Sequence, residues 1–126
     1  MKNIVIIGGT KGIGKAIVSE VVDNNNVVCL SRNQTDFSHD NYTFHNFDAL
    51  VDDYPDFESV DCLIYCPGSI NLKPISTLSL DDFRNDFELN VIGAVRAIKK
   101  YLNLLKKSGS ASILLFSTVA TKLGIC

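Results

Sequence analysis

The chain has 126 residues, of which 46% are hydrophobic and 21% are charged, and its formal net charge at pH 7 is -2. This length suits one compact domain and excludes two of ordinary size. The near-balanced charge provides no basic surface for nucleic acid, and no apolar run approaches the ~20 residues that cross a bilayer. We therefore expect a soluble, cytoplasmic protein that binds neither nucleic acid nor membrane.

The four cysteines favour free thiols over a metal or redox site. Cys29, Cys62 and Cys66 lie in apolar, β-branched segments, where cysteine commonly serves as a small hydrophobic residue, and Cys126 ends the chain. The spacing of Cys62 and Cys66 is not Cys-x-x-Cys, and no histidine cluster accompanies them. We predict unpaired thiols in a reducing compartment and no metal site.

The first part of the chain alternates short apolar runs with polar or helical segments. Asn3–Ile7 is typical of a buried strand, which the following glycines end. The apolar spacing of Lys15–Val22 predicts a helix packed on a sheet, and Asp23 with the three asparagines after it predicts a turn. Strands are expected next at Val27–Leu30 and Thr43–Phe47, with little or no helix in the polar stretch between them.

The second part contains two further strands and the best-marked helix. Cys62–Tyr65 and Ser112–Phe116 are apolar on both faces, which is typical of a parallel sheet covered by helices. Ser79 followed by Asp82 predicts the helix start, and Gly109 predicts its end. Apolar residues at steps of three and four predict the face that packs on the sheet: Phe83, Phe87, Val91, Ala94, Ile98, Leu102 and Leu105.

A glycine-rich loop joins the first strand to the first helix. Its glycines let the backbone turn tightly and approach a pyrophosphate, at a helix N-terminus whose free N–H groups favour anions. An ordinary strand-to-helix turn is the alternative, but a strand before the loop and a helix after it are the context of a dinucleotide fingerprint. The residues predicted to bind the dinucleotide here are Gly8, Thr10, Lys11, Gly12, Ile13 and Gly14.

The adenosine end of such a dinucleotide is expected about twenty residues further on, after the second strand. A carboxylate there would bind a ribose hydroxyl and repel a phosphate, but the chain has Ser31, Arg32 and Asn33. Arg32 can pair bidentately with a 2′-phosphate, and Lys11 can add a second positive charge, although either can also be a solvated surface cation. Two cations at the expected places favour NADP(H) over NAD(H).

Together these features resemble the short-chain dehydrogenase/reductase family, in order from Met1 to Cys126. The glycine loop is similar to the family's Thr-Gly-x-x-x-Gly-Ile-Gly, with Ile7 in place of the threonine. The resemblance implies that Asp48 contacts the adenine, with Ala49 beside it. It also implies that Cys66-Pro67-Gly68 approaches the cofactor through its backbone, because only the glycine of the family's Asn-Asn-Ala-Gly is retained.

The catalytic candidates also come from the resemblance. Asn90 lies on the apolar stripe, where an amide must find partners and a helix bend is expected at Asn90–Gly93. It resembles the family's asparagine that holds a water in a proton relay. The tract after the last strand resembles the family's Ser-Ser-Val-Ala, which places Thr118 at the catalytic serine, with Ser117 next to it.

The fold that the resemblance implies is a doubly wound, Rossmann-like α/β sheet with strand order 3-2-1-4-5 and helices on both faces. Residues 1–126 would form one NAD(P)-binding domain. The implied function is NADP(H)-dependent hydride transfer between nicotinamide and a small carbonyl or alcohol, in a homo-oligomer formed through the 80–107 helix. A non-catalytic NADP(H)-binding or sensor module and a structural fragment without nucleotide are the alternatives.

The family's Tyr-x-x-x-Lys proton donor would lie beyond Cys126. We therefore expect the domain to be incomplete at its C-terminus and this chain alone to be inactive as a dehydrogenase. In the expected order, the last apolar strand is also the sheet edge, and an uncovered apolar edge invites pairing. We expect either an absent C-terminal half or a partner along that strand.

Overall fold

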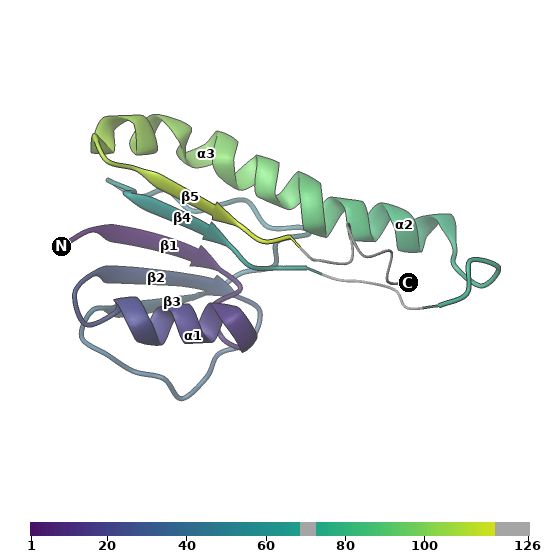
Figure 1. Ribbon diagram of the computed structural model, residues 1–126, viewed down its shortest axis with the longest axis horizontal. Helices are drawn as coiled ribbons and strands as arrows, with labels where there is room; N and C mark the ends of the chain where they lie inside the picture. The colour runs from purple at the N-terminus through teal and green to yellow at the C-terminus, as the bar shows by residue number, and fades with distance from the viewer. Residues whose placement is uncertain (69–72, 118–126) are drawn as a thin grey trace.

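The computed structural model describes residues 1–68 and 73–117. Its parallel strands form one sheet in the order β3-β2-β1-β4-β5, as predicted (Figure 1). Each observed strand agrees with its predicted range to within one residue at either end. The strands are β1 (Asn3–Ile7), β2 (Asn26–Ser31), β3 (Tyr42–Asn46), β4 (Cys62–Tyr65) and β5 (Ser112–Leu115).

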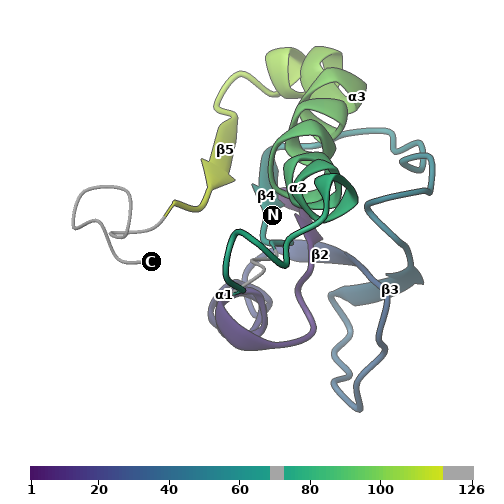
Figure 2. The same ribbon diagram turned by 90° about the vertical axis from the view of Figure 1, so that its right-hand side faces the viewer.

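One helix covers each face of the sheet (Figure 2). Side chains of the central strand β1 alternate between the two faces, so each helix packs on a different set of them. Ile4 and Ile6 pack with Val18 and Val22 from α1 (Gly12–Val21) and its C-cap. On the other face, Val5 and Ile7 join a core that contains four residues of α3 (Gly93–Ser108). Those residues are Ala94, Ala97, Tyr101 and Leu105.

The long helix starts and ends where the sequence predicts. Ser79 Oγ accepts from the Asp82 N–H at 3.0 Å, while the Ser79 N–H donates to Asp82 Oδ2 at 3.0 Å, a complete capping box that starts α2 (Leu80–Phe87). Gly109 ends α3 in the left-handed conformation at φ 78°. Between the two helices lies a π turn (Glu88–Ile92), so at the place where the sequence predicts a bend, Asn90–Gly93, the structure has a change of helix type.

The predicted buried stripe of this helix is partly wrong. Ala94 and Leu105 are buried, but Phe83, Phe87, Val91 and Leu102 are exposed, by 39–56%. Two causes are visible. The π turn changes the phase of the helix between α2 and α3, and α2 extends past the carboxyl ends of the strands, where no sheet lies beneath it (Figure 1).

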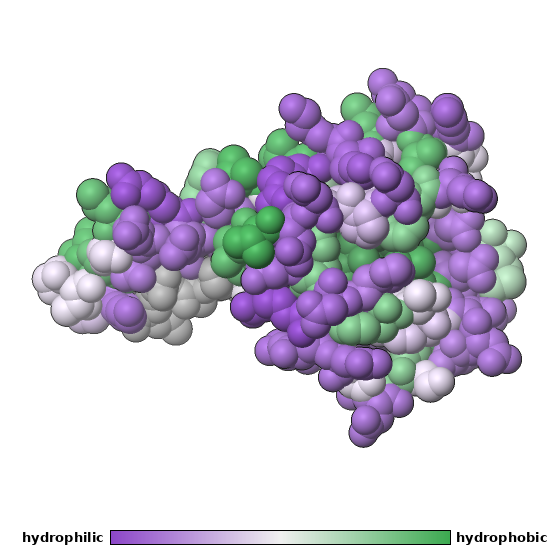
Figure 3. Space-filling view, turned by 180° about the vertical axis from the view of Figure 1, so that it is seen from behind, coloured by the Kyte–Doolittle hydropathy of each residue, from purple (hydrophilic) through white to green (hydrophobic). Residues whose placement is uncertain are grey.

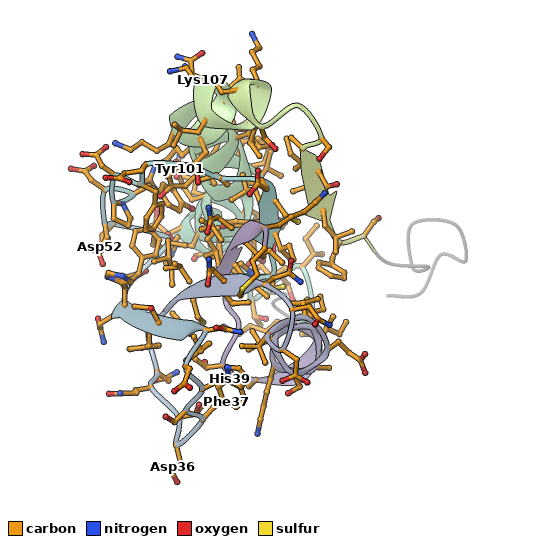
Figure 4. The ribbon with its side chains drawn as sticks, turned by 90° about the vertical axis from the view of Figure 1, so that its left-hand side faces the viewer. Asp36, Phe37, His39, Asp52, Tyr101 and Lys107 are labelled. Atoms are coloured by element: carbon orange, nitrogen blue, oxygen red, sulfur yellow. The ribbon has the colours of Figure 1, made fainter. Side chains whose placement is uncertain are left out.

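The segment between β2 and β3 contains no helix, as expected, and folds back on the end of α1. His39 Nε2 and Asp23 Oδ1 lie 3.1 Å apart, and the Asn41 side-chain amide donates to the Val22 carbonyl at 2.9 Å. Figure 4 shows Phe37 and His39 of this loop on the side of α1, whereas Asp36 points outward at the tip of the loop. Within the described ranges, no helix is both long and apolar enough to cross a membrane.

Candidate nucleotide-binding site

A pocket of about 380 Å³ opens at the carboxyl ends of β1, β2 and β4. Every residue that the sequence assigned to the cofactor lines it: Gly8, Thr10, Lys11, Gly12, Ile13, Gly14, Ser31, Arg32, Asp48, Ala49, Cys66, Pro67 and Gly68. Sequence reasoning did not assign Leu30, Phe47, Leu89 and Phe116 to the cofactor, although they also line the pocket. The first two follow the rule that residues ending parallel strands face the ligand crevice, a signal present in the sequence.

Two glycines of the loop are required by close backbone approach. Gly8 has φ +80°, and a Cβ there would lie 3.1 Å from the Pro67 nitrogen at the end of β4. A Cβ at Gly14 would lie within 3.0 Å of the Gly8 carbonyl oxygen, a separation that side chains do not tolerate. At these two positions the loop backbone therefore packs with no side chain in between. The first turn of α1 contains no acidic side chain, which leaves its N–H groups suited to an anion.

The glycine loop is hydrogen-bonded to the end of β2. Thr10 is buried, and its hydroxyl shares a hydrogen bond of 2.9 Å with the hydroxyl of Ser31. The Gly8 N–H donates to the Leu30 carbonyl at 2.8 Å. Because of these contacts, exposed Lys11 and exposed Arg32 border the same pocket although they are far apart in sequence.

The turn after β3 contributes the wall predicted to meet the adenine. The Leu50 N–H donates to Asp48 Oδ1 at 2.9 Å, and the Asp48 N–H donates to Asp52 Oδ2 at 2.7 Å. Arg96 from α3 donates to the Ala49 carbonyl at 3.0 Å. Asp48 is thus half-buried with one carboxylate oxygen engaged by its own turn, and Ala49 is buried.

The end of β4 closes the pocket with a backbone segment. The Cys66 N–H donates to the Ile7 carbonyl at 2.9 Å, and Pro67 lies against Gly8. Burial raises the pKa of the Cys66 thiol to about 11, so the thiol stays protonated at neutral pH. Cys29, Cys62 and Cys66 are all unpaired, with Cys29 buried and the other two half-buried.

The structure describes two of the three catalytic candidates, Asn90 and Ser117. Asn90 lies in the π turn and is exposed, which corrects the prediction that it is buried on the apolar stripe, and the cause is the same change of helix phase. Its Oδ1 nevertheless points to the end of β4, 3.0 Å from the position that a Cβ of Gly68 would take. Ser117 is exposed after β5. Thr118 lies outside the described residues.

All four tyrosines of the sequence lie in the described ranges, and each hydroxyl has a partner in the interior. Tyr65 donates to the Leu89 carbonyl, and Tyr54 donates to the Gly93 carbonyl at 3.1 Å. Tyr101 donates to the Pro55 carbonyl at 2.7 Å, and Tyr42 hydrogen-bonds Cys29. Burial raises the pKa of each phenol, to about 12 for Tyr65. None has the lowered pKa that a proton donor near neutral pH needs.

Comparison with known proteins connects this chain to one family. Residues 34–126 match the family model of the short chain dehydrogenases. No curated protein matches the chain. Among solved structures, the ligand-free aldohexose dehydrogenase of Thermoplasma acidophilum is similar with a TM-score of 0.82 and 24% identity, over 94% of this chain and 49% of that one.

Two further similar structures hold a cofactor. A short chain dehydrogenase from Leptospira borgpetersenii with bound NAD+ has a TM-score of 0.83 and 19% identity, over 99% of this chain and 54% of that one. ElxO with NADPH bound has a TM-score of 0.81 and 23% identity, over 98% of this chain and 58% of that one. At these identities the likeness concerns the fold, and the chain spans about half the length of each structure.

Proposed function

Because the chain belongs to the short chain dehydrogenase family, we propose that its pocket binds NADP(H) for hydride transfer between nicotinamide and a small carbonyl or alcohol. The observation that carries the proposal is the convergence of the glycine loop, Lys11 and Arg32 on one pocket. Nicotinamide cofactors of both kinds occur in proteins of this fold, NAD+ in the Leptospira enzyme and NADPH in ElxO. In this proposal residues 1–126 belong to one NAD(P)-binding domain. The proposed location is the cytoplasm, because a reducing compartment keeps cysteines as free thiols.

Different groups of lining residues suit different parts of the cofactor. The bare backbone at Gly8 and Gly14, with the N–H groups that start α1, suits the pyrophosphate. Arg32 and Lys11 suit a 2′-phosphate, because both are cations at the rim of the pocket. The turn at Asp48 receives the adenine. When bound, the cofactor supplies the hydride, and the protein orients it and shields it from water.

The phosphate preference is tested by Arg32→Ala. Losing a bidentate pair costs about 1.5–3 kcal/mol, so the Kd for NADPH should rise about tenfold or more, while the Kd for NADH stays unchanged. Fluorescence titration with each cofactor measures both values. Lys15→Ala is the matched control, since Lys15 is an exposed cation of α1 that is not among the residues lining the pocket. Equal affinity of the parent chain for both cofactors would contradict the pairing.

The catalytic part of the proposal assigns three side chains. Thr118, with Ser117 beside it, polarises the substrate oxygen, and Asn90 positions a water for proton transfer. The engaged hydroxyls of Tyr54, Tyr65 and the other two tyrosines favour a second candidate, an NADP(H)-binding or sensor module that performs no hydride transfer. Turnover by the chain decides between these two functions.

We also propose that a second copy of the chain covers the exposed apolar face of the long helix. Hydrophobic side chains are visible on the projecting arm that α2 forms (Figure 3). Along α2, the π turn and α3, large apolar residues that are 39–69% exposed recur at helical spacing. These residues are Leu80, Phe83, Phe87, Val91, Val95 and Leu102.

Substitution of Val95 tests this contact. Light scattering behind size exclusion should give the parent chain twice its 13.8 kDa mass, and Val95→Lys should give 13.8 kDa, because a charge in the apolar face prevents association. Lys99→Ala controls for an exposed change on the same helix. Dissociation by Leu114→Lys alone would instead place the contact at the exposed β5, and a monomeric parent chain would refute both.

A further inference from the structure

Two buried tyrosines donate hydrogen bonds to the backbone of the π turn (Glu88–Ile92) and of the residue after it. Such a turn bonds i to i+5, as the Gly93 N–H does to the Glu88 carbonyl, and so disturbs the regular pairing of nearby carbonyls. Tyr65, on β4, donates its hydroxyl to the Leu89 carbonyl. Tyr54, in the loop after β3, donates to the Gly93 carbonyl at 3.1 Å. The two hydroxyls thus bind carbonyls at both ends of the segment that contains Asn90.

Gly93 is the residue that lets Tyr65 reach the turn. A Cβ at position 93 would lie within 3.0 Å of the Tyr65 hydroxyl oxygen, which is too close. The same Cβ would lie 3.1 Å from the ring carbon Cζ, so the hydroxyl oxygen is the main obstacle. Tyr65 is only 4% exposed, and its ring packs within the core cluster on the α3 face of the sheet. The hydroxyl and the missing side chain therefore form a complementary pair between β4 and the helix, which lies above the sheet (Figure 2).

The π turn borders the pocket. Leu89 of the turn and Gly68 both line the pocket, and Asn90 Oδ1 lies beside Gly68. We propose that Tyr65 and Tyr54 are positioning residues whose hydroxyls maintain the π turn and thereby direct the Asn90 amide to the end of β4. The inference concerns the chain itself, and its effect on cofactor affinity rests on the proposed function.

Removal of single hydroxyls tests the inference, with Tyr101→Phe as the matched control. Tyr101 is fully buried in the same core, and its hydroxyl donates to the Pro55 carbonyl at 2.7 Å, a partner outside the π turn. All three Tyr→Phe variants should lower the urea midpoint of unfolding similarly. Only Tyr65→Phe and Tyr54→Phe should move the side-chain amide resonance of Asn90, identified by its loss in Asn90→Asp, and raise the Kd for NADPH about fivefold.

A double substitution separates the hydroxyl from the ring. Gly93→Ala should lower the urea midpoint strongly, because the new Cβ collides with the Tyr65 hydroxyl. Adding Tyr65→Phe removes that oxygen and should recover part of the loss, although Tyr65→Phe alone is destabilising.

Additive losses, or an Asn90 resonance that moves equally in Tyr101→Phe, would overturn the inference. If the parent chain binds no NADPH, the proposed function fails. The resonance and the double variant still decide the role of the tyrosines, because neither measurement needs the cofactor.

Discussion

Carbonyl reduction by the 126-residue chain should be about 10²–10⁴-fold slower than reduction by a short chain dehydrogenase that carries the Tyr-x-x-x-Lys pair. That factor is what general acid catalysis typically contributes. None of the four tyrosines present can supply it, because each hydroxyl bonds inside the core and burial raises the pKa of each phenol. A phenol with a pKa near 12, as for Tyr65, transfers its proton poorly at neutral pH.

The measurement is NADPH oxidation with a panel of aldehydes and ketones, at a cofactor concentration that titration shows to be saturating. Tyr101→Phe should leave the residual rate unchanged, since its hydroxyl lies with Pro55 rather than at the pocket. A rate equal to that of the comparison enzyme would contradict this prediction. Loss of such a rate in one Tyr→Phe variant would then identify the donor that the geometry excludes.

Gly14→Ala should abolish nucleotide binding and lower the free energy of unfolding by about 3 kcal/mol, the upper range for overpacking. The added Cβ meets the Gly8 carbonyl oxygen and lies 3.0 Å from the Gly9 Cα. Both neighbours are backbone, so no side-chain rotation relieves the collision. The glycine loop must separate from the start of α1, which displaces the N–H groups expected to bind the pyrophosphate.

Gly109→Ala is the control for this prediction. Gly109 has φ +78° with nothing within 4 Å of an added Cβ, and it lies at the end of α3, away from the pocket. Its substitution should cost about 1–2 kcal/mol through left-handed strain and leave the Kd for NADPH unchanged. Urea unfolding and fluorescence titration measure both quantities. Equal binding by Gly14→Ala and Gly109→Ala would show that the close approach at Gly14 has no part in the site.

Local features of the sequence predicted the strands and the glycine loop because each depends on neighbours in the chain. Apolar runs define β1 and β4, and the glycine loop follows β1 directly. Strand order and the lining residues after β3 and β4 join distant segments, and they were predicted from the family resemblance instead. The buried face of α3 could not be assigned in the same way. It depends on the π turn, which Tyr65 and Tyr54 contact from distant segments, and no periodicity in the helix encodes those partners.

The arrangement of β1 has a consequence for biosynthesis. β1 is made first, yet it lies at the centre of the sheet and pairs with both β2 and β4. Its α1 face can close as soon as β2 leaves the ribosome, because α1 directly precedes β2. Its other face waits for α3, whose last residue follows Ser31 by roughly 4–15 s at 5–20 residues per second. During that interval Val5, Ile7 and Leu30 lack the α3 residues that complete their cluster, so the cores on the two faces of the sheet are completed at different times during translation.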